Sequence, residues 1–252
     1  MQENIIGGLI SDFISLILTI GIGWTIYFFT ERRKLLGFFN IKDTKRLVIY
    51  LGNLRIIQGG SLGTDNLPRG YTGTTIVYSE QVTATKYKER FNFLVPSISE
   101  RPTFLSKILF SDIKVTSLPS PLTENEIEAN CSIISFGSPG YNKVSEVIEN
   151  YSETRVRFIN DNSAIQPDNI PPLNDTLNGF IQRLVITNDG STRSIFYVAG
   201  LSEHGTIGAA NYLIDNWKEL RKKYGDNTSF NIVVRFPTAN FDNYTIVSER
   251  AI

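Results

Sequence analysis

The sequence is poor in the residues that link a protein covalently or through a metal ion. It contains one cysteine, Cys131, and one histidine, His204. A lone cysteine forms no internal disulfide, which fits a reducing compartment, and the pair excludes a zinc site of the usual Cys/His type. Cys131 opens an apolar run, so we expect it to be a packed core residue. We therefore expect neither a metal nor a cofactor.

The chain also lacks an excess of charge of either sign. Its 25 basic and 25 acidic residues cancel over 252 positions. No basic run marks a track for nucleic acid, so we expect no binding of duplex nucleic acid. The balance leaves room for a small anionic ligand held by backbone amides. A hydrophobic share of 41% with 20% charged residues is that of a chain able to form a packed core.

There is one long hydrophobic run, and it lies near the N-terminus. The uncharged stretch Phe13–Thr30, extended by Ile5–Ser11, is long enough to cross about 30 Å of hydrocarbon. A signal peptide is the alternative, but the chain starts Gln2-Glu3-Asn4 and lacks a small-residue cleavage site. We predict a transmembrane helix over residues 5–30.

A charged cluster, Glu31–Lys34, follows this run directly. Because basic residues favour the cytoplasmic side, the cluster places the N-terminus outside and the rest of the chain inside. We predict a single-pass protein of the cell membrane, in which a juxtamembrane linker over residues 31–45 leads to a cytoplasmic domain over residues 46–252.

The predicted transmembrane helix has small side chains at every fourth position, namely Gly7, Ser11, Ser15, Thr19 and Gly23. Such a ladder lets membrane helices approach closely, so we expect a homo-oligomer, a tetramer, in the lipid bilayer. Asp12 shares a polar stripe with Ser15 and Thr19, and intramembrane carboxylates usually face a bundle interior or a water path. A ring of these helices would line a cation pore. The alternative is a dimerising anchor whose Asp12 reaches the outer surface.

After residue 45, apolar runs of strand length alternate with helical patterns. We expect strands at 46–52, 113–118, 131–136, 155–159, 179–187, 194–200 and 230–236, and helices at 80–95, 103–110, 141–151 and 206–224. This alternation predicts an α/β domain, a mostly parallel Rossmann-like sheet with flanking helices on both faces, in two halves at 46–122 and 123–252. Asp189-Gly190 predicts a tight hairpin turn, Gly225 a helix C-cap, and the polar segment 160–178 an exposed loop.

Glycine marks the ends of three predicted strands, at Gly52-Asn53, Gly137–Asn142 and Gly200–Thr206. The carboxyl ends of parallel strands meet at one edge, and the first amides of a helix bind phosphate without a basic side chain. Neither turn before a helix matches GxGxxG or a Walker loop, and plain helix capping is the alternative. The predicted ligand-binding residues are Gly52, Asn53, Gly137, Ser138, Pro139, Gly140, Tyr141, Asn142, Glu203, His204, Gly205 and Thr206.

Two of these turns resemble motifs of a group of bacterial and archaeal Rossmannoid proteins, a Gly-Gly-Pro-x-x-Asn turn and a later Ala-Gly-x-x-x-x-Gly-Thr-x-x-Ala-Ala helix start. The first reads Gly137-Ser-Pro-Gly-Tyr-Asn142 here, with serine at the second glycine. The second, Ala199–Ala210, fits in full. Joined to a membrane helix, such a domain is similar to nucleotide-sensing effectors of bacterial anti-phage systems, including SLOG-like sensors and the channel-forming effector of the Hailong system.

The resemblance implies an effector of antiviral defence in the cell inner membrane. Its cytoplasmic domain would bind a nucleotide or oligonucleotide second messenger made by a partner nucleotidyltransferase, and the ligand would control an ion channel. An enzyme is the first alternative: a membrane-tethered nucleoside or nucleotide hydrolase or glycosyl-transferring enzyme, with Glu80, Glu203 or His204 in acid–base work. A passive adaptor that recruits another protein is the second.

Overall fold

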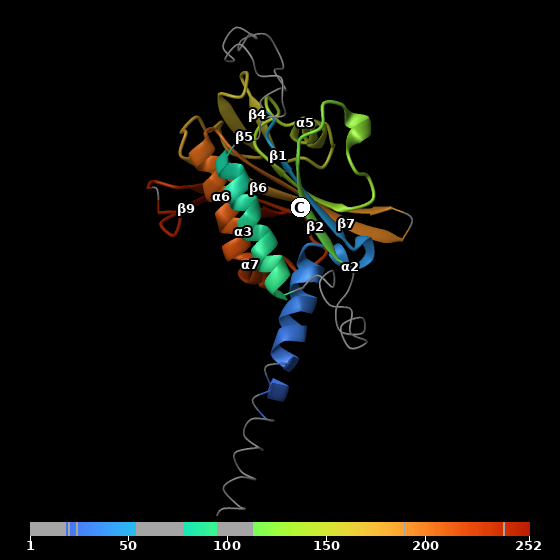
Figure 1. The fold of residues 1–252 in the computed structure, drawn as a ribbon. Helices are drawn as coiled ribbons and strands as arrows, with labels where there is room; N and C mark the ends of the chain where they lie inside the picture. The colour runs from blue at the N-terminus through green and yellow to red at the C-terminus, as the bar shows by residue number, and fades with distance from the viewer. Residues whose placement is uncertain are drawn as a thin grey trace, which may run out of the picture.

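The computed structural model describes residues 19, 21–23, 25–53, 78–94, 113–188, 190–238 and 240–252. Its centre is one seven-stranded sheet with the strand order β2-β1-β3-β7-β6-β8-β9 (Figure 1). The strands are β1 Arg46–Leu51, β2 Lys114–Pro119, β3 Ser132–Phe136, β6 Asn178–Asn188, β7 Ser191–Gly200, β8 Phe230–Arg235 and β9 Thr245–Ala251.

The sheet is mixed. β1 pairs in parallel with β2 and β3, and β3 pairs in parallel with β7. The pairings of β6 with β7, β6 with β8, and β8 with β9 are antiparallel. The α/β class is confirmed, and so is the predicted hairpin, whose turn residue Gly190 has φ 78°. Because a tight turn can join only antiparallel strands, this hairpin ends the parallel part of the sheet at β7.

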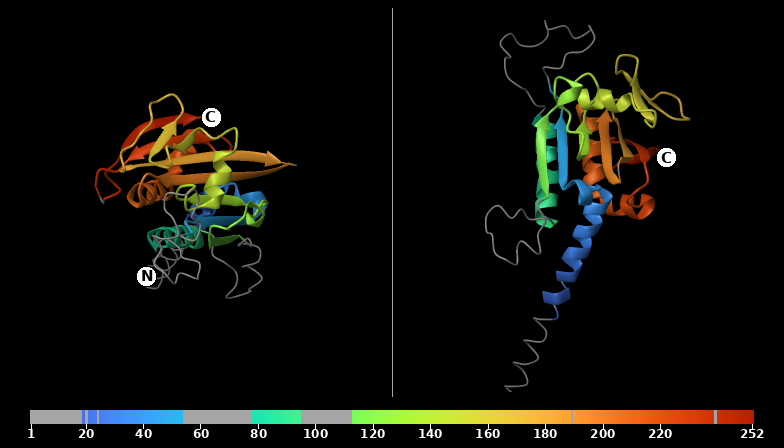
Figure 2. Two further views of the ribbon diagram at one scale, coloured as in Figure 1. Left: turned by 90° about the horizontal axis from the view of Figure 1, so that it is seen from above. Right: turned by 90° about the vertical axis from the view of Figure 1, so that its right-hand side faces the viewer.

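Different elements cover the two faces of the sheet (Figure 2). The helices α3 (Tyr78–Leu94), α6 (Glu203–Asp215) and α7 (Trp217–Tyr224) share one hydrophobic core with the sheet. The short helix α5 (Lys143–Glu149) and the hairpin of β4 (Val156–Ile159) and β5 (Ala164–Pro167) form the second core on the other face. The single-turn helices are α2 (Ile41–Thr44) and η3 (Glu124–Glu126). Cys131 is buried, as predicted.

Three sequence-based expectations are wrong in their details. The helix expected over 206–224 is two helices, broken at Asn216, whose side-chain amide donates to the Tyr212 carbonyl at 3.0 Å and so competes with helix continuation. The segment 160–178 contains strand β5 as well as loop. The chain also forms an edge strand, β9, where no strand was expected. The helix expected over 103–110 lies outside the described residues.

The segment before β1 packs into the domain. Residues 25–38 are helical and project from the sheet (Figure 1). Leu35, Phe38, Phe39 and Ile41 are fully buried, so the segment expected to be a linker contributes to the hydrophobic core.

Most of the membrane span predicted over residues 5–30 lies outside the described residues, including Gly7, Ser11, Asp12 and Ser15. Thr19 and Gly23 have helical conformation. Within the part of the chain that is described, no helix has both the length and the apolar character needed to span a bilayer.

Candidate functional site

The candidate site lies where the chain leaves the neighbouring strands β1 and β3 in opposite directions. From β1 the chain continues through α3 on one face to β2, whereas from β3 it continues through α5 on the other face (Figure 1). In open α/β sheets, ligands bind at the carboxyl ends of strands at such a switch point. Two of the three predicted glycine turns, Gly52-Asn53 and Gly137–Asn142, are found here.

Hydrogen bonds join these two turns directly. The Asn53 amide donates to the Tyr141 carbonyl at 2.7 Å. The side-chain amide of Asn142 donates to the Phe136 carbonyl at 2.7 Å and to the Tyr50 carbonyl at 3.3 Å. The turn after β3 is therefore held by the end of β1 as well as by its own strand, and the predicted residues of both turns form one edge.

A buried carboxyl group, Glu80, lies between the two turns. It comes from the first turn of α3 and is 5% exposed. Its Oε2 accepts a hydrogen bond from the Gly52 amide at 2.6 Å, and its Oε1 faces Gly137. Burial raises the pKa of Glu80 to about 7, with the Gly52 amide opposing the rise and the charge of Glu203 adding to it. Near neutral pH the carboxyl group is therefore protonated in part of the molecules, where it can donate a hydrogen bond, and ionised in the rest, where it can only accept.

Gly137 is needed for two reasons. Its φ of 88° lies in the left-handed region, and a Cβ at this position would stand 3.0 Å from Glu80 Oε1. A side chain would therefore strain the backbone and press on the buried carboxyl group. The absence of a side chain lets the turn approach Glu80 closely.

The amides that begin the two predicted phosphate-binding helices already have partners. In α5, the Val144 amide donates to Asn142 Oδ1 at 2.9 Å, and the Lys143 amide donates to Ser120 Oγ at 2.8 Å. In α6, the Gly205 amide donates to Ser202 Oγ at 3.1 Å. Helix capping, the alternative kept above, accounts for these three amides, and α5 is only seven residues long.

The third glycine turn mainly packs α6 onto the sheet. A Cβ on Gly205 would overlap the Asn178 carbonyl, so glycine allows the close contact between α6 and β6. The His204 Nε2 lies 3.0 Å from the Phe236 carbonyl, which places the ring beside the end of β8. Thr206 is buried and donates to the Ser202 carbonyl at 3.1 Å. Only Glu203 acts on the β1–β3 edge, through its charge on Glu80.

The remaining predicted residues belong to the turn after β3. The Ser138 carbonyl accepts the amides of Tyr141 and Asn142 at 3.1 and 3.0 Å, which closes the turn around Pro139 and Gly140. The Tyr141 side chain is exposed. Sequence reasoning named Glu80 as a carboxylate for a ribose or for acid–base work, without a pairing partner. The sequence signal for the position of Glu80 is that an acidic residue opens the helix α3, which follows a glycine-rich loop.

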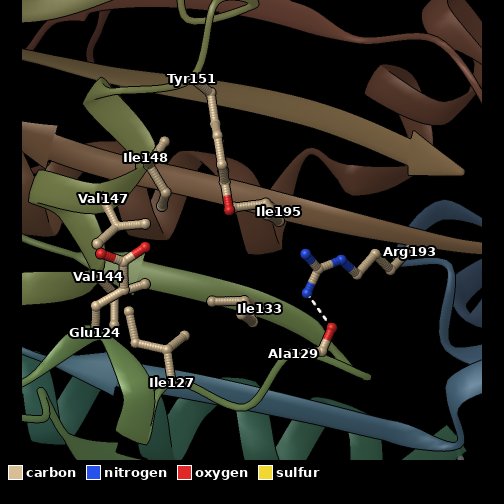
Figure 3. A pocket seen from close by; sticks show the side chains of 10 residues that line it. All are labelled: Glu124, Ile127, Ala129, Ile133, Val144, Val147, Ile148, Tyr151, Arg193 and Ile195. Carbon is tan, nitrogen blue, oxygen red and sulfur yellow. Dashed lines mark hydrogen bonds between the residues drawn. The ribbon is translucent and has the colours of Figure 1, made fainter. Parts of the chain in front are cut away.

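A separate pocket lies on the α5 face of the sheet (Figure 3). Its cavity volume is about 140 Å³, and aliphatic side chains from α5, β3 and β7 form most of its wall. Arg193 lies at one side and donates to the Ala129 carbonyl. None of the predicted ligand-binding residues lines this pocket; those that do are Glu124, Ile127, Ala129, Ile133, Val144, Val147, Ile148, Tyr151, Arg193 and Ile195.

The β1–β3 edge thus combines the buried carboxyl group of Glu80, the glycine Gly137 facing it, and the charge of Glu203, which acts on Glu80. Such an edge can bind hydroxyl or amino groups of a ligand, or move a proton at Glu80. Comparison of the chain with models of protein families, with curated proteins and with solved structures finds no match.

Proposed function

We propose that the α/β domain binds a nucleotide or oligonucleotide second messenger at the β1–β3 edge, and that the ligand controls an oligomeric membrane effector, an ion channel in antiviral defence. The observation that carries the proposal is the buried carboxyl group of Glu80 at the switch point, between Gly52 and Gly137. Carboxyl groups whose pKa values are raised by burial beside a second charged group cluster at functional sites.

The chemistry of this edge suits the polar side of a nucleotide. With Oε2 held by the Gly52 amide, Glu80 keeps Oε1 directed at the Gly137 turn. An ionised Oε1 accepts hydrogen bonds from ribose hydroxyls or base amino groups. In this proposal the phosphates lie away from Glu80 and Glu203, because both carboxylates repel them.

The membrane half of the proposal comes from the sequence. The small-residue ladder from Gly7 to Gly23 packs the helices of a homo-oligomer, a tetramer, and Asp12 lines the cation path. A ligand changes this assembly only if it binds two arrangements of the protein with different affinity. The Rossmann-like site and the pore together describe a nucleotide-gated effector of the kind the resemblance implies.

The first experiment is native mass spectrometry of the full chain, extracted from its host membrane in mild detergent. The expected result is a closed oligomer that carries a nucleotide. A monomer without a bound small molecule would refute both the pore and the ligand.

A pair of glycine variants then locates the ligand. Gly137→Ala and Gly190→Ala place a Cβ at similar positive φ values, 88° and 78°, but only the first faces Glu80, since nothing lies within 4 Å of the second. We expect Gly137→Ala alone to lose the co-purified nucleotide. Equal retention by the two variants would move the site elsewhere.

The pKa of Glu80 favours a second candidate, a membrane-tethered enzyme that processes nucleosides or nucleotides. A pKa of about 7 is suited to a general acid or base. This candidate predicts that purified protein hydrolyses a nucleoside or nucleotide, that Glu80→Gln abolishes turnover, and that Asp12→Asn and Ser15→Leu have no effect. The effector predicts no turnover, and loss of cell depolarisation in Asp12→Asn and Ser15→Leu.

A further inference from the structure

We propose that α6 and α7 transmit ligand binding from the β1–β3 edge to the juxtamembrane helix, residues 25–38, and that the ion pair between Lys218 and Glu31 is the releasable contact between them. We call this contact the latch. The inference rests on the proposed function and names how its site would control the membrane segment.

The two helices connect the opposite ends of the domain. α6 begins after Ser202 at the carboxyl edge of the sheet, and its 13 residues span about 20 Å at 1.5 Å per residue. After the break at Asn216, α7 lies beside the juxtamembrane helix in both views (Figure 1, Figure 2). Glu203, in the first turn of α6, acts electrostatically on Glu80. One continuous pair of helices therefore has one end at the candidate site and the other at the latch.

The latch has a buried acid at its centre. Glu31 is 5% exposed, accepts a hydrogen bond from Lys34 Nζ at 2.8 Å, and forms an ion pair with Lys218. Lys218 Nζ also lies 3.5 Å from the Tyr27 hydroxyl and 5.8 Å from the centre of the Tyr27 ring. Burial opposes ionisation, but the two ammonium groups outweigh it and lower the pKa of Glu31. The acid is therefore charged at neutral pH, and the latch is closed.

The other end of the juxtamembrane helix is fixed. The Arg183 guanidinium lies 5.0 Å from the ring centre of buried Phe38 and donates to the Gly225 carbonyl at 3.0 Å. The Asn40 side chain donates to Ser194 Oγ at 3.0 Å. These buried contacts anchor residues 38–40 in the core, whereas the Lys218 side chain is about half exposed, at 49%. Solvent weakens an ion pair with an exposed partner, so the latch opens more easily than the anchor.

α7 also contacts the juxtamembrane helix just after its own end. A Cβ on Gly37 would overlap the Asp226 carboxylate, which Arg221 holds with two hydrogen bonds of 2.7 and 3.0 Å. Lys218 at the start of α7 and Asp226 beyond its end thus touch one helix at two points. A rotation of α7 about the Asp226 contact would pull Lys218 from Glu31 and tilt the helix.

Spin labels on the full chain in mild detergent test the latch without any ligand. Ile26→Cys and Lys222→Cys in a Cys131→Ser background place one label on an exposed position of the juxtamembrane helix and one on the exposed face of α7. We expect Lys218→Glu, which sets two acids against each other, to lengthen and broaden the distance distribution. The swap of Glu31→Lys with Lys218→Glu should restore it. An unchanged distribution in Lys218→Glu would overturn the latch.

Membrane potential in cells that express the full chain tests the transmission. We expect Lys218→Glu to change basal depolarisation at least fivefold, and the swap to return it to within twofold of wild type. Glu219→Lys, a charge reversal at the neighbouring exposed position of α7, is the matched control and should match wild type. Transmission from α7 to the pore would be refuted if Lys218→Glu shifts the spin-label distances but leaves the membrane potential unchanged, while Asp12→Asn changes the potential. Equal potentials in wild type and Asp12→Asn would refute the channel instead, while the spin-label shift would still support the latch.

Discussion

Replacing Glu80 with glutamine isolates the effect of the buried charge. Glutamine keeps the shape of the side chain and an oxygen that can accept the Gly52 amide, which now donates to Glu80 Oε2 at 2.6 Å. It removes only the ability to ionise. The difference in unfolding free energy between wild type and Glu80→Gln therefore measures the cost of an ionised carboxylate at the β1–β3 edge.

The size of the effect follows from the pKa. Burial raises the pKa of Glu80 from 4.5 to about 7, so the folded protein binds more protons than the unfolded chain between these values. The free energy of unfolding of the wild type then falls as pH rises through this window. At 1.36 kcal/mol per pKa unit, the loss between about pH 5 and pH 8 is roughly 2.5 kcal/mol. Glu80→Gln lacks this loss.

This pH-dependent loss of unfolding free energy is measured by urea unfolding of the full chain in mild detergent, at about pH 5, 6, 7 and 8. We expect the stability of Glu80→Gln relative to wild type to rise by about 2.5 kcal/mol across the series. Glu203→Gln is the control, because removing that charge lowers the pKa of Glu80 and should reduce the pH dependence without abolishing it. Parallel pH profiles for wild type and Glu80→Gln would show that Glu80 is not buried as described and would refute the reasoning.

Three further predictions concern packing, each measured by urea unfolding. Arg183→Met should cost about 1–3 kcal/mol, because it leaves the Gly225 carbonyl without its buried donor, whereas Arg157→Met on the surface should change stability by less than about 0.5 kcal/mol. Gly205→Ala should cost about 1–3 kcal/mol through its overlap with the Asn178 carbonyl, and a neutral result would mean that α6 sits farther from β6. Val147→Ile should gain about 0.8 kcal/mol by filling the pocket of about 140 Å³, and a loss would mean that the pocket is already filled.

Elements with a strong local signal were predictable from the sequence. β1 after Arg46 is a continuous apolar run, and β3 contains only apolar residues and two serines, which is typical of strands buried on both faces. All residues of β3, and all but the first of β1, are buried. The β6–β7 hairpin follows from Asp189-Gly190, because only a few residue types accept the positive φ of a tight turn. α3 ends at Leu94, close to Pro96, as a helix before proline should.

Elements that depend on distant contacts were not predictable. Among the described strands, β9 pairs with β8 alone, and five of its seven residues are exposed. Its sequence therefore lacks the apolar alternation of a half-buried strand. The charged cluster at 31–34 suggested a linker, yet Glu31 is buried because Lys218, far along the chain, neutralises it. Sequence patterns report only on residues that are close along the chain, whereas β9 and the burial of Glu31 depend on residues that are distant in sequence and close in space.

In the candidate site, too, features with a local sequence signal were predictable and features that depend on distant contacts were not. Glycine at the strand ends indicated that the turns after β1 and β3 meet, because the carboxyl ends of adjacent parallel strands share an edge. It did not indicate that the third turn, Gly200–Thr206, mainly packs α6 onto the sheet. Nothing local indicated that His204 lies against the Phe236 carbonyl, since that contact depends on how β8 ends. The importance of Glu80 also depends on burial, which raises its pKa only once α3 covers the sheet.

The position of the candidate site limits how a ligand bound there would act on residues 25–38 in the proposed mechanism. β1 joins the two directly, since only Lys45 separates its first residue, Arg46, from α2, and its last residue, Leu51, precedes Gly52. It pairs with β2 on one side and β3 on the other, so it cannot slide without breaking two ladders of hydrogen bonds. α6 instead meets the sheet through the small residues Gly205 and Ala209, which lie against Asn178 and Gly179 of β6. A packed helix can shift by small amounts along such an interface. We therefore propose that ligand binding at the β1–β3 edge reaches the juxtamembrane helix through α6 and α7, with these helices moving against strands that stay fixed.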